Sequence, residues 1–192
     1  MADTVTTVIY IIGIFLFIIF VYAIIYNINK SKENASNRKE QDSYIQRNNI
    51  TKTRDLEYCG PSGNVCRFVV DDTSRSVYVS SAESEGKLVC IPYKELLSMN
   101  VFETTFNDGS LGGSILGGIM AGGVGSYLGA TRGRTYIRAY EIVIQRRNIQ
   151  FPQFHMTLFD NARVDPNSNT YKDALQFSRE MQSIINIIRC DW

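Results

Sequence analysis

The residues that could do chemistry in this chain are few and scattered. His155 is the single histidine in the sequence, and it lies in a segment with strand character. No CxxC pair is formed by any of the four cysteines, Cys59, Cys66, Cys90 and Cys190, and no histidine cluster accompanies them. Zinc sites and Cys–His nucleophile pairs need such groups together. The sequence therefore predicts no catalytic, cofactor-binding or metal site and no enzyme activity.

Two other patterns favour turns and packing over chemistry. Asp71 and Asp72 precede Thr73 and Ser74, a composition typical of a tight turn. No Gly-Lys-Ser/Thr follows the glycines at 123–125, so a phosphate-binding loop is not expected. The net charge of +1 gives no reason to expect nucleic acid as a partner.

The most unusual spacing belongs to a glycine-rich segment. Residues 111–130 (LGGSILGGIMAGGVGSYLGA) contain eight glycines and no charged residue. A close-packed helical hairpin within 109–131 is the preferred interpretation, although a second membrane span and a glycine-rich loop also fit the composition. GxxxG spacing allows two helices to approach closely. The candidate positions for helix packing and self-association are Gly113, Gly117, Gly118, Gly122, Gly125 and Gly129.

The N-terminal residues determine where any such surface acts. Residues 1–4 form a short tail without Lys or Arg, and residues 5–26 contain no charge. These 22 residues reach about 33 Å as a helix, enough to cross a bilayer core of about 30 Å. No small-x-small cleavage site follows them, so a transmembrane helix is expected and not a signal peptide.

The charges that follow the apolar run predict its orientation. Lys30, Lys32, Arg38 and Lys39 come directly after it, and no Lys or Arg precedes it. The positive-inside rule then places the N-terminus outside the cell (inner) membrane and the C-terminal domain in the cytoplasm. The same four side chains are candidate contacts with anionic lipid headgroups.

The rest of the chain divides into a polar segment and a domain. Residues 27–54 are polar, mixed in charge and without a clear period, which predicts a juxtamembrane linker that is helical near the membrane and then flexible. Within residues 55–192, alternation and turn signals predict a helical turn at 93–97 and six strands, at 65–70, 76–80, 87–92, 98–106, 135–146 and 154–159.

Two finer expectations concern side-chain faces. In the strand at 135–146, Tyr136, Arg138 and Tyr140 are expected to share one face. A helix over 170–189 is expected to begin with a capping box formed by Thr170 and Asp173. Its apolar residues recur at intervals of three and four, so this helix should pack its apolar stripe against the sheet.

These elements, in this order, resemble a group of small bacterial membrane-anchored proteins with a pleckstrin-homology-like (PH-like) domain. The matching pieces are FVVDD, SVYVSS, LVCIPYKELLSMNVFE, the glycine-rich insert, YIRAYEIVIQ, FHMTLF and YKDALQFSREMQSIINII. The resemblance covers roughly residues 65–189. It implies an α+β fold in which a bent antiparallel sheet or barrel, seven-stranded in the typical domain, is closed by the C-terminal helix. The helix tryptophan of eukaryotic relatives is absent, since Trp192 lies after the helix, and their basic phosphoinositide cluster has no clear counterpart.

Because no catalytic or cofactor-binding site is expected, the expected function is inferred from the predicted membrane anchor. The sequence favours a non-enzymatic, single-pass, membrane-tethered interaction or scaffold module, with self-association through the glycine-rich hairpin. Its expected partners are the lipid bilayer, a second copy of the chain and a protein partner. Two alternatives stay open: a membrane-inserting or pore-related protein acting through the glycine segment, and a lipid-headgroup-binding domain.

Overall fold

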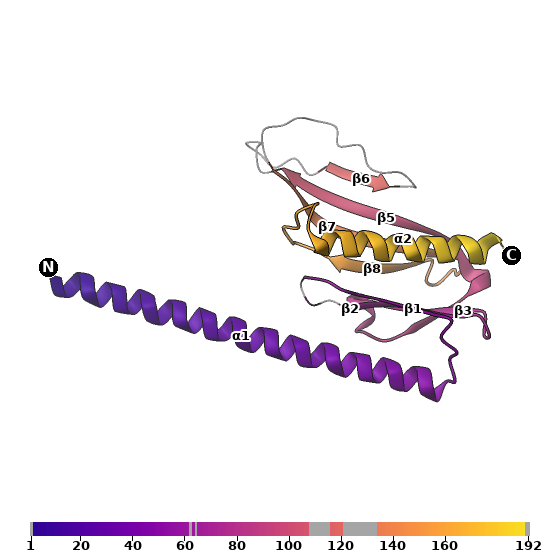
Figure 1. Cartoon of the computed structure of the whole chain (residues 1–192), viewed down its shortest axis with the longest axis horizontal. Helices are drawn as coiled ribbons and strands as arrows, with labels where there is room; N and C mark the ends of the chain where they lie inside the picture. The colour runs from indigo at the N-terminus through magenta and orange to yellow at the C-terminus, as the bar shows by residue number, and fades with distance from the viewer. Residues whose placement is uncertain (1, 62, 64, 108–115, 121–133, 191–192) are drawn as a thin grey trace.

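The computed structural model describes residues 2–61, 63, 65–107, 116–120 and 134–190 (Figure 1). The chain begins with one long helix, α1 (Ala2–Arg47). Among the described residues, one helix, the Gly13–Arg47 part of α1, is long and apolar enough to cross a membrane. The apolar half of α1 extends away from the rest of the molecule, and no side chain in its apolar window is buried.

Two four-stranded antiparallel sheets follow α1. Sheet A has the strand order β1-β2-β3-β4, with β1 (Arg54–Cys59), β2 (Val65–Asp71), β3 (Ser76–Ser80) and β4 (Val89–Pro92). Sheet B has the order β6-β5-β7-β8, with β5 (Leu96–Asn107), β6 (Leu116–Met120), β7 (Thr135–Arg146) and β8 (Gln153–Phe159). Short 3-10 turns occupy Ala82–Ser84 (η1) and Tyr93–Glu95 (η2). The expected α+β class is confirmed, whereas the two sheets are not joined into a closed barrel.

The main core lies between the two sheets and the C-terminal helix α2 (Asn169–Cys190), which packs against β1 and β5. Its largest fully buried side chains include Phe68 and Ile91 from sheet A, and Tyr140, Ile142 and Met156 from sheet B. Burying a side chain of this size stabilises the fold by about 1.5–3 kcal/mol. Because these buried side chains come from both sheets, their burial holds sheet A against sheet B.

The expected apolar stripe of α2 is confirmed, but its predicted cap is wrong. The buried residues of α2 are Ala174, Phe177, Ser178, Met181, Ile185 and Ile188. The hydroxyl oxygen of Ser168, and not that of Thr170, accepts a hydrogen bond from the backbone N–H of Tyr171 at 3.3 Å. The helix begins one residue before the predicted start, so Ser168 stands at the position where a side-chain oxygen reaches the free N–H groups.

The six predicted strands are present as β2, β3, β4, β5, β7 and β8, and the helical turn at 93–97 is present as η2. Strand β1 was missed because most of it is polar and exposed, and it starts within the predicted linker. Strand β6 was missed because the glycine segment was expected to be helical. That expectation is wrong for Leu116–Met120, which pair antiparallel with β5.

The structure describes two of the six glycines that were candidates for helix packing. Gly117 and Gly118 lie in β6, opposite Thr104 and Glu103 of β5. A strand satisfies its backbone groups through the neighbouring strand, so no helical face passes through these two glycines. Gly113, Gly122, Gly125 and Gly129 lie outside the described residues.

A bulge changes which residues of β7 face the core. The pairing with β5 passes from Thr104↔Ala139 to Thr105↔Ile137, so Arg138 is an extra residue on β7. Ile137 and Tyr140 are therefore both fully buried, while Arg138 is exposed. The expectation that Tyr136, Arg138 and Tyr140 share one face is wrong, because strict alternation fails wherever one strand carries an extra residue.

Candidate functional site

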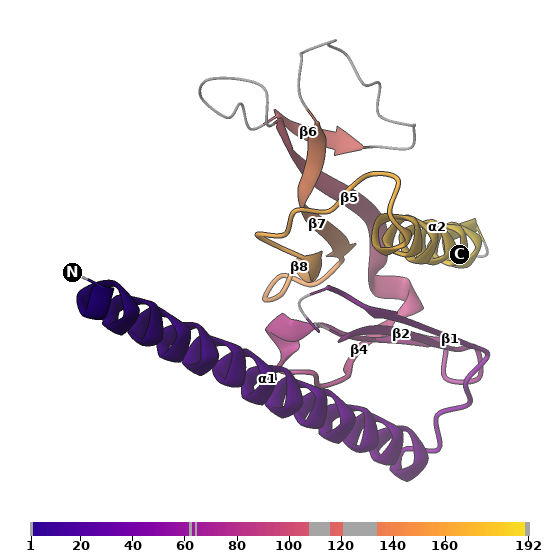
Figure 2. The same cartoon turned by 60° about the vertical axis from the view of Figure 1, so that its left-hand side comes forward.

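The polar half of α1 is not a flexible linker. The helix continues without interruption to Arg47 and lies along the outer face of sheet A (Figure 2). The positions of this half that lose solvent exposure recur every three or four residues, which places them on one face of a helix. They are Lys30, Asn34, Asn37, Gln41, Tyr44 and Ile45. The sequence expectation for residues 27–54 is thus corrected for residues 27–47, which form a helix docked on the domain.

Two amide side chains of α1 donate hydrogen bonds to the domain. The Asn34 side-chain NH₂ donates to the carbonyl oxygen of Gly63 at 2.5 Å. The Gln41 side-chain NH₂ donates to the carbonyl oxygen of Gly86 at 2.6 Å and to the Ser80 hydroxyl at 3.1 Å. The groups that these two amides contact are two turn carbonyls and a hydroxyl. An amide at these positions satisfies groups that an apolar side chain would leave without partners.

Gly63 and Gly86 also allow α1 to lie close to the turns of sheet A. Gly63 and Gly86 both have positive φ, +75° and +74°. A Cβ at Gly63 would lie 3.1 Å from the Lys30 side chain, and one at Gly86 would lie 2.8 Å from the Asn37 amide nitrogen. Both turns therefore need glycine for their backbone conformation and for the space that α1 occupies.

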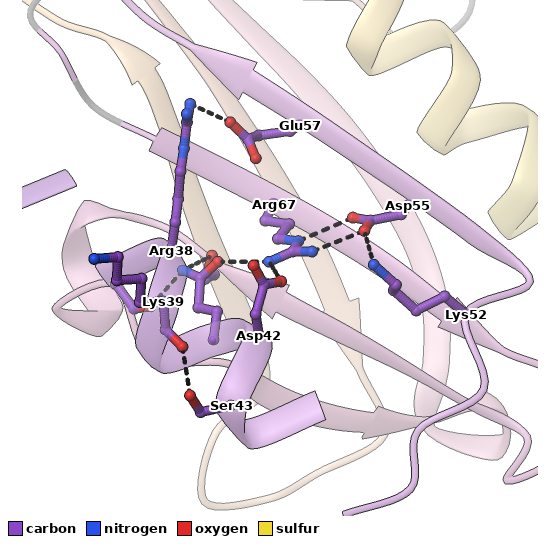
Figure 3. A network of polar contacts seen from close by, with 11 residues as sticks. Arg38, Lys39, Asp42, Ser43, Lys52, Asp55, Glu57 and Arg67 are labelled. Atoms are coloured by element: carbon purple, nitrogen blue, oxygen red, sulfur yellow. Dashed lines mark hydrogen bonds and ion pairs between the residues drawn. The ribbon is translucent and has the colours of Figure 1, made fainter. Parts of the chain in front are cut away.

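A buried arginine joins α1 to two strands of sheet A (Figure 3). Arg67 of β2 is 5% exposed. Its Nε and Nη2 donate to the two carboxylate oxygens of Asp55 on β1, at 2.9 and 2.8 Å. Its Nη1 donates to Asp42 of α1 at 2.9 Å. The planar guanidinium suits this geometry, since it can bind one carboxylate through two bonds and still reach a second.

The titration of the network follows from these contacts. Burial raises the pKa of Asp55, but hydrogen bonds from Arg67 and Lys52 outweigh it and hold that pKa below its ordinary value. Hydrogen bonds to Asp55 raise the pKa of Arg67 further above its ordinary value, against the effect of burial. Both groups are therefore charged across the physiological pH range, and the link between helix and sheet is ionic throughout it.

Two further contacts flank the arginine. Towards the apolar half of α1, Arg38 forms an ion pair with Glu57 of β1. At the other end, Ile45 and Ile50 pack against Val69 and Tyr78 on the outer face of sheet A. The contact region between α1 and sheet A, here called the junction, thus has an apolar end at Ile45 and Ile50, a buried ionic centre at Arg67 and a polar end at Arg38.

Two hollows lie along α1 at the polar end of the junction. A groove of about 650 Å³ lies between α1 and the β1–β2 turn, and its lining includes Tyr26, Lys30, Arg38, Gly60 and Pro61. A second hollow of about 180 Å³ lies between α1 and the turns that contain Gly63 and Gly86. The Asn34–Gly63 hydrogen bond joins residues that line both of them.

The four predicted headgroup contacts do not form one cluster. Lys30 packs against the Gly63 turn and Arg38 bonds to the domain, whereas Lys32 and Lys39 are exposed on the helix. Only the first two line the groove.

The groups first considered for chemistry lie apart from the junction. His155 Nδ1 on β8 is 2.5 Å from a carboxylate oxygen of Glu141 on the neighbouring strand β7. Both side chains are partly exposed. Within the described ranges, no three His, Cys, Asp or Glu side chains gather where they could hold a metal ion.

The cysteines and the aspartate pair also have structural surroundings. All four cysteines are free, and Cys66 is buried, which raises the pKa of its thiol to about 12. The predicted turn at Asp71 is confirmed, since its carboxylate accepts hydrogen bonds from the backbone N–H groups of Thr73 and Ser74.

Sequence reasoning missed the residues of the junction. The sequence analysis assigns no role to Arg67 and places Asn34, Asn37 and Gln41 in the predicted linker. The signal was present as amides at helical spacing in a segment with few apolar residues, which a search for apolar periodicity overlooks. Comparison with known proteins adds no relative, because no family model, no curated protein and no solved structure matches the chain.

Proposed function

We propose that this chain is a single-pass membrane protein that holds a PH-like interaction domain against the cytoplasmic face of the cell (inner) membrane in a fixed orientation. The domain binds a partner and catalyses no reaction. The observation that carries the proposal is the continuity of α1, which runs from its apolar half directly into the buried contacts of Gln41 and Arg67. An anchor that served only to tether the domain would need none of these contacts.

The fold supports the PH-like part of the proposal. Antiparallel strands followed by a C-terminal helix agree with the order that the resemblance implies, although the described strands form two sheets and not one bent sheet, and the helix contacts both of them. Strand β6 and the glycine-rich residues around it come between β5 and β7, where the resemblance places an insert. Fold alone says little about ligand, so the interaction is argued from the surface.

A candidate partner surface lies at the hairpin between β7 and β8. Ile149 is 100% exposed and Phe151 is 64% exposed there. This hairpin lies at the end of the domain opposite to the side from which the apolar half of α1 extends (Figure 1). Large apolar side chains at an exposed hairpin are typical of surfaces that another protein covers.

A cross-link tests the fixed orientation. The Asn37 Cβ is 3.2 Å from the place where a Cβ at Gly86 would lie, close to the 3.5–4.5 Å that separates the Cβ atoms of a disulfide. Asn37→Cys combined with Gly86→Cys, with the three exposed cysteines changed to Ser, should form an intramolecular disulfide in membranes. Ser36→Cys with Gly86→Cys is the matched control, because Ser36 is exposed. Because a cysteine at Gly86 is strained, Gly86→Cys alone must first keep the hydrogen-exchange protection of residues 41–47; equal linking of both pairs would then contradict a docked helix.

Thiol labelling tests the topology. Cys90 is exposed on β4, so a membrane-impermeant maleimide should label it only after the cells are permeabilised. Labelling in intact cells would place the domain outside and refute the proposed orientation.

Self-association is a second candidate function. β6 is the end strand of sheet B, and an end strand has one backbone edge that a strand of a second copy can pair with. Ile119→Pro in β6 tests it through the mass of the purified full-length protein, because proline cannot donate a backbone hydrogen bond to a neighbouring strand. An unchanged oligomeric state would contradict self-association through this segment.

A further inference from the structure

The link between α1 and sheet A is short and is partly fixed to the sheet. Residues 48–53 join the end of α1 to the start of β1. The backbone N–H of Thr51 donates to the Asp71 carboxylate at 3.3 Å, and that of Thr53 donates to the Val70 carbonyl oxygen at 2.8 Å. Because these two bonds attach the second half of the link to sheet A, the hinge at which α1 changes direction lies at the first two residues of the link.

The hinge contains a residue in an unfavourable backbone conformation. Asn49 has a φ of +51°. This conformation closes a turn in which the N–H of Asn49 donates to the Gln46 carbonyl oxygen at 3.2 Å and that of Ile50 donates to the Ile45 carbonyl oxygen at 3.0 Å. A left-handed residue other than glycine costs free energy, although asparagine tolerates this conformation better than most. Short hinges under strain favour the exchange of an element between two copies of a chain.

The domain does not need its own helix to keep its core closed. The main core contains no residue of α1. Within residues 27–47 only the side chains of Gln41 and Ile45 are buried, whereas α2 buries six residues. The two hollows along the junction further reduce the contact between α1 and the sheet. The polar half of α1 can therefore leave sheet A without opening the space between the two sheets.

A second copy in the same membrane offers an identical helix at the same depth. Its residues 5–26 cross the same bilayer, so the docking residues of its α1 lie level with those of the first copy. Any other helix at this depth would need two amides and a carboxylate at matching intervals. The contacts that an exchanged helix would remake are Asn34–Gly63, Gln41–Gly86 and Asp42–Arg67.

We propose that neighbouring copies of this chain exchange α1, so that the polar half of α1 from one copy docks on sheet A of the other. The closed and the exchanged forms share the docking contacts, so the hinge and the density of chains in the membrane determine their ratio. Each domain keeps the same orientation to the membrane in both forms. The inference rests on the membrane placement proposed above.

Cysteines placed on two different copies test the exchange. One tagged copy carries Asn37→Cys and a second, differently tagged copy carries Gly86→Cys, with the three exposed cysteines changed to Ser in both, and the two full-length chains are expressed together. In a docked helix the Asn37 Cβ is 3.2 Å from the place of a Cβ at Gly86, so the helix of one copy must dock on the other for these two cysteines to link. Ser36→Cys in place of Asn37→Cys is the matched control, because Ser36 is exposed.

The expected result is a disulfide between the two tags that is more abundant for Asn37→Cys than for Ser36→Cys. Equal linking by the two variants would show chance collision and would overturn the proposal. Cysteines that link when one chain carries both, but not when two chains share them, would refute the exchange alone and leave the docked helix in place. Absence of the link in both arrangements would refute the docked helix itself, and the exchange with it.

Hinge variants that keep the native Gly86 supply an independent measurement. Asn49→Ala makes the left-handed hinge more costly and should raise the ratio of dimer to monomer about fivefold for each hinge, in the mass distribution of the full-length protein in detergent. Asn49→Gly removes that cost and should lower the ratio. A ratio that responds to neither variant would overturn the proposal, and a ratio that responds only to Ile119→Pro would assign the association to β6 instead.

Discussion

Replacing Gln41 with Ala distinguishes a docked helix from a linker, because the two views predict opposite signs. In an exposed polar linker, Ala is a better helix former than Gln, so the change would be neutral or slightly stabilising. In the structure, Gln41 is 3% exposed and its NH₂ group donates to the Gly86 carbonyl and the Ser80 hydroxyl. The change should therefore weaken the attachment of α1 to sheet A.

The magnitude follows from the contacts that are lost. The two hydrogen bonds from the Gln41 NH₂ group contribute about 1 kcal/mol each, the longer bond that its oxygen accepts from Arg67 at 3.4 Å adds little, and the gain in helix propensity offsets only a few tenths of a kcal/mol. We expect the free energy that holds α1 on the sheet to fall by about 2 kcal/mol, which corresponds to an increase of about 30-fold in the equilibrium population of the undocked helix. The loss should be local, since the main core between the sheets contains no residue of α1.

Amide hydrogen exchange on the full-length protein in detergent micelles measures this loss. The exchange of residues 41–47 should accelerate about 30-fold in Gln41→Ala, while β5 in the main core keeps its protection. Gln46→Ala is the matched control, because Gln46 is exposed on the same helix and its replacement should change exchange by about twofold or less. If the two variants exchange alike, the docked junction is refuted.

Three further predictions concern the turn, the core and the thiols. Gly86→Ala should destabilise the junction by about 1–2 kcal/mol, because an alanine is strained at a φ of +74°, and adding Asn37→Ala should restore only the steric part of the loss in a thermal melt. Burial raises the pKa of Glu103 above its ordinary 4.5, against the hydrogen bond from Tyr171. The folded protein should therefore lose stability as the pH rises from 4.5 through that raised pKa, and Glu103→Gln should melt higher than the wild type at pH 7 and no higher at pH 4; a constant difference would contradict this. In the native protein, maleimide should label the exposed Cys59, Cys90 and Cys190 but leave Cys66 unreacted until the protein unfolds, and rapid labelling of all four thiols would show that Cys66 is not buried.

Individual helices and strands could be predicted where apolar residues recur at the period of the element. The apolar residues of α2 recur at three and four and are buried as expected, and six strands follow from alternation between turn signals. The uncharged run at 5–26 predicts a helix long enough to span a membrane, and such a helix is present. In each case the period of the side chains matches the period of the backbone, so neighbouring residues alone are sufficient evidence.

The junction could not be predicted in the same way, because its contacts join residues far apart in the sequence. Arg67 becomes a buried centre only when the fold brings Asp42 and Asp55 within 3 Å of it, and Gln41 becomes a docking residue only beside Gly86. The face reversal in β7 likewise depends on the bulge against β5.

The sequence by itself determined the membrane-spanning length of α1, the strand-rich domain and the amphipathic C-terminal helix. Tertiary structure alone decided that the polar half of α1 is part of the domain and that a groove opens beside Tyr26 and Lys30. The physical reason is that apolar residues buried on one face of a helix or strand recur at a fixed spacing in the sequence. A polar interface gains its stability from specific partners, and folding alone supplies them.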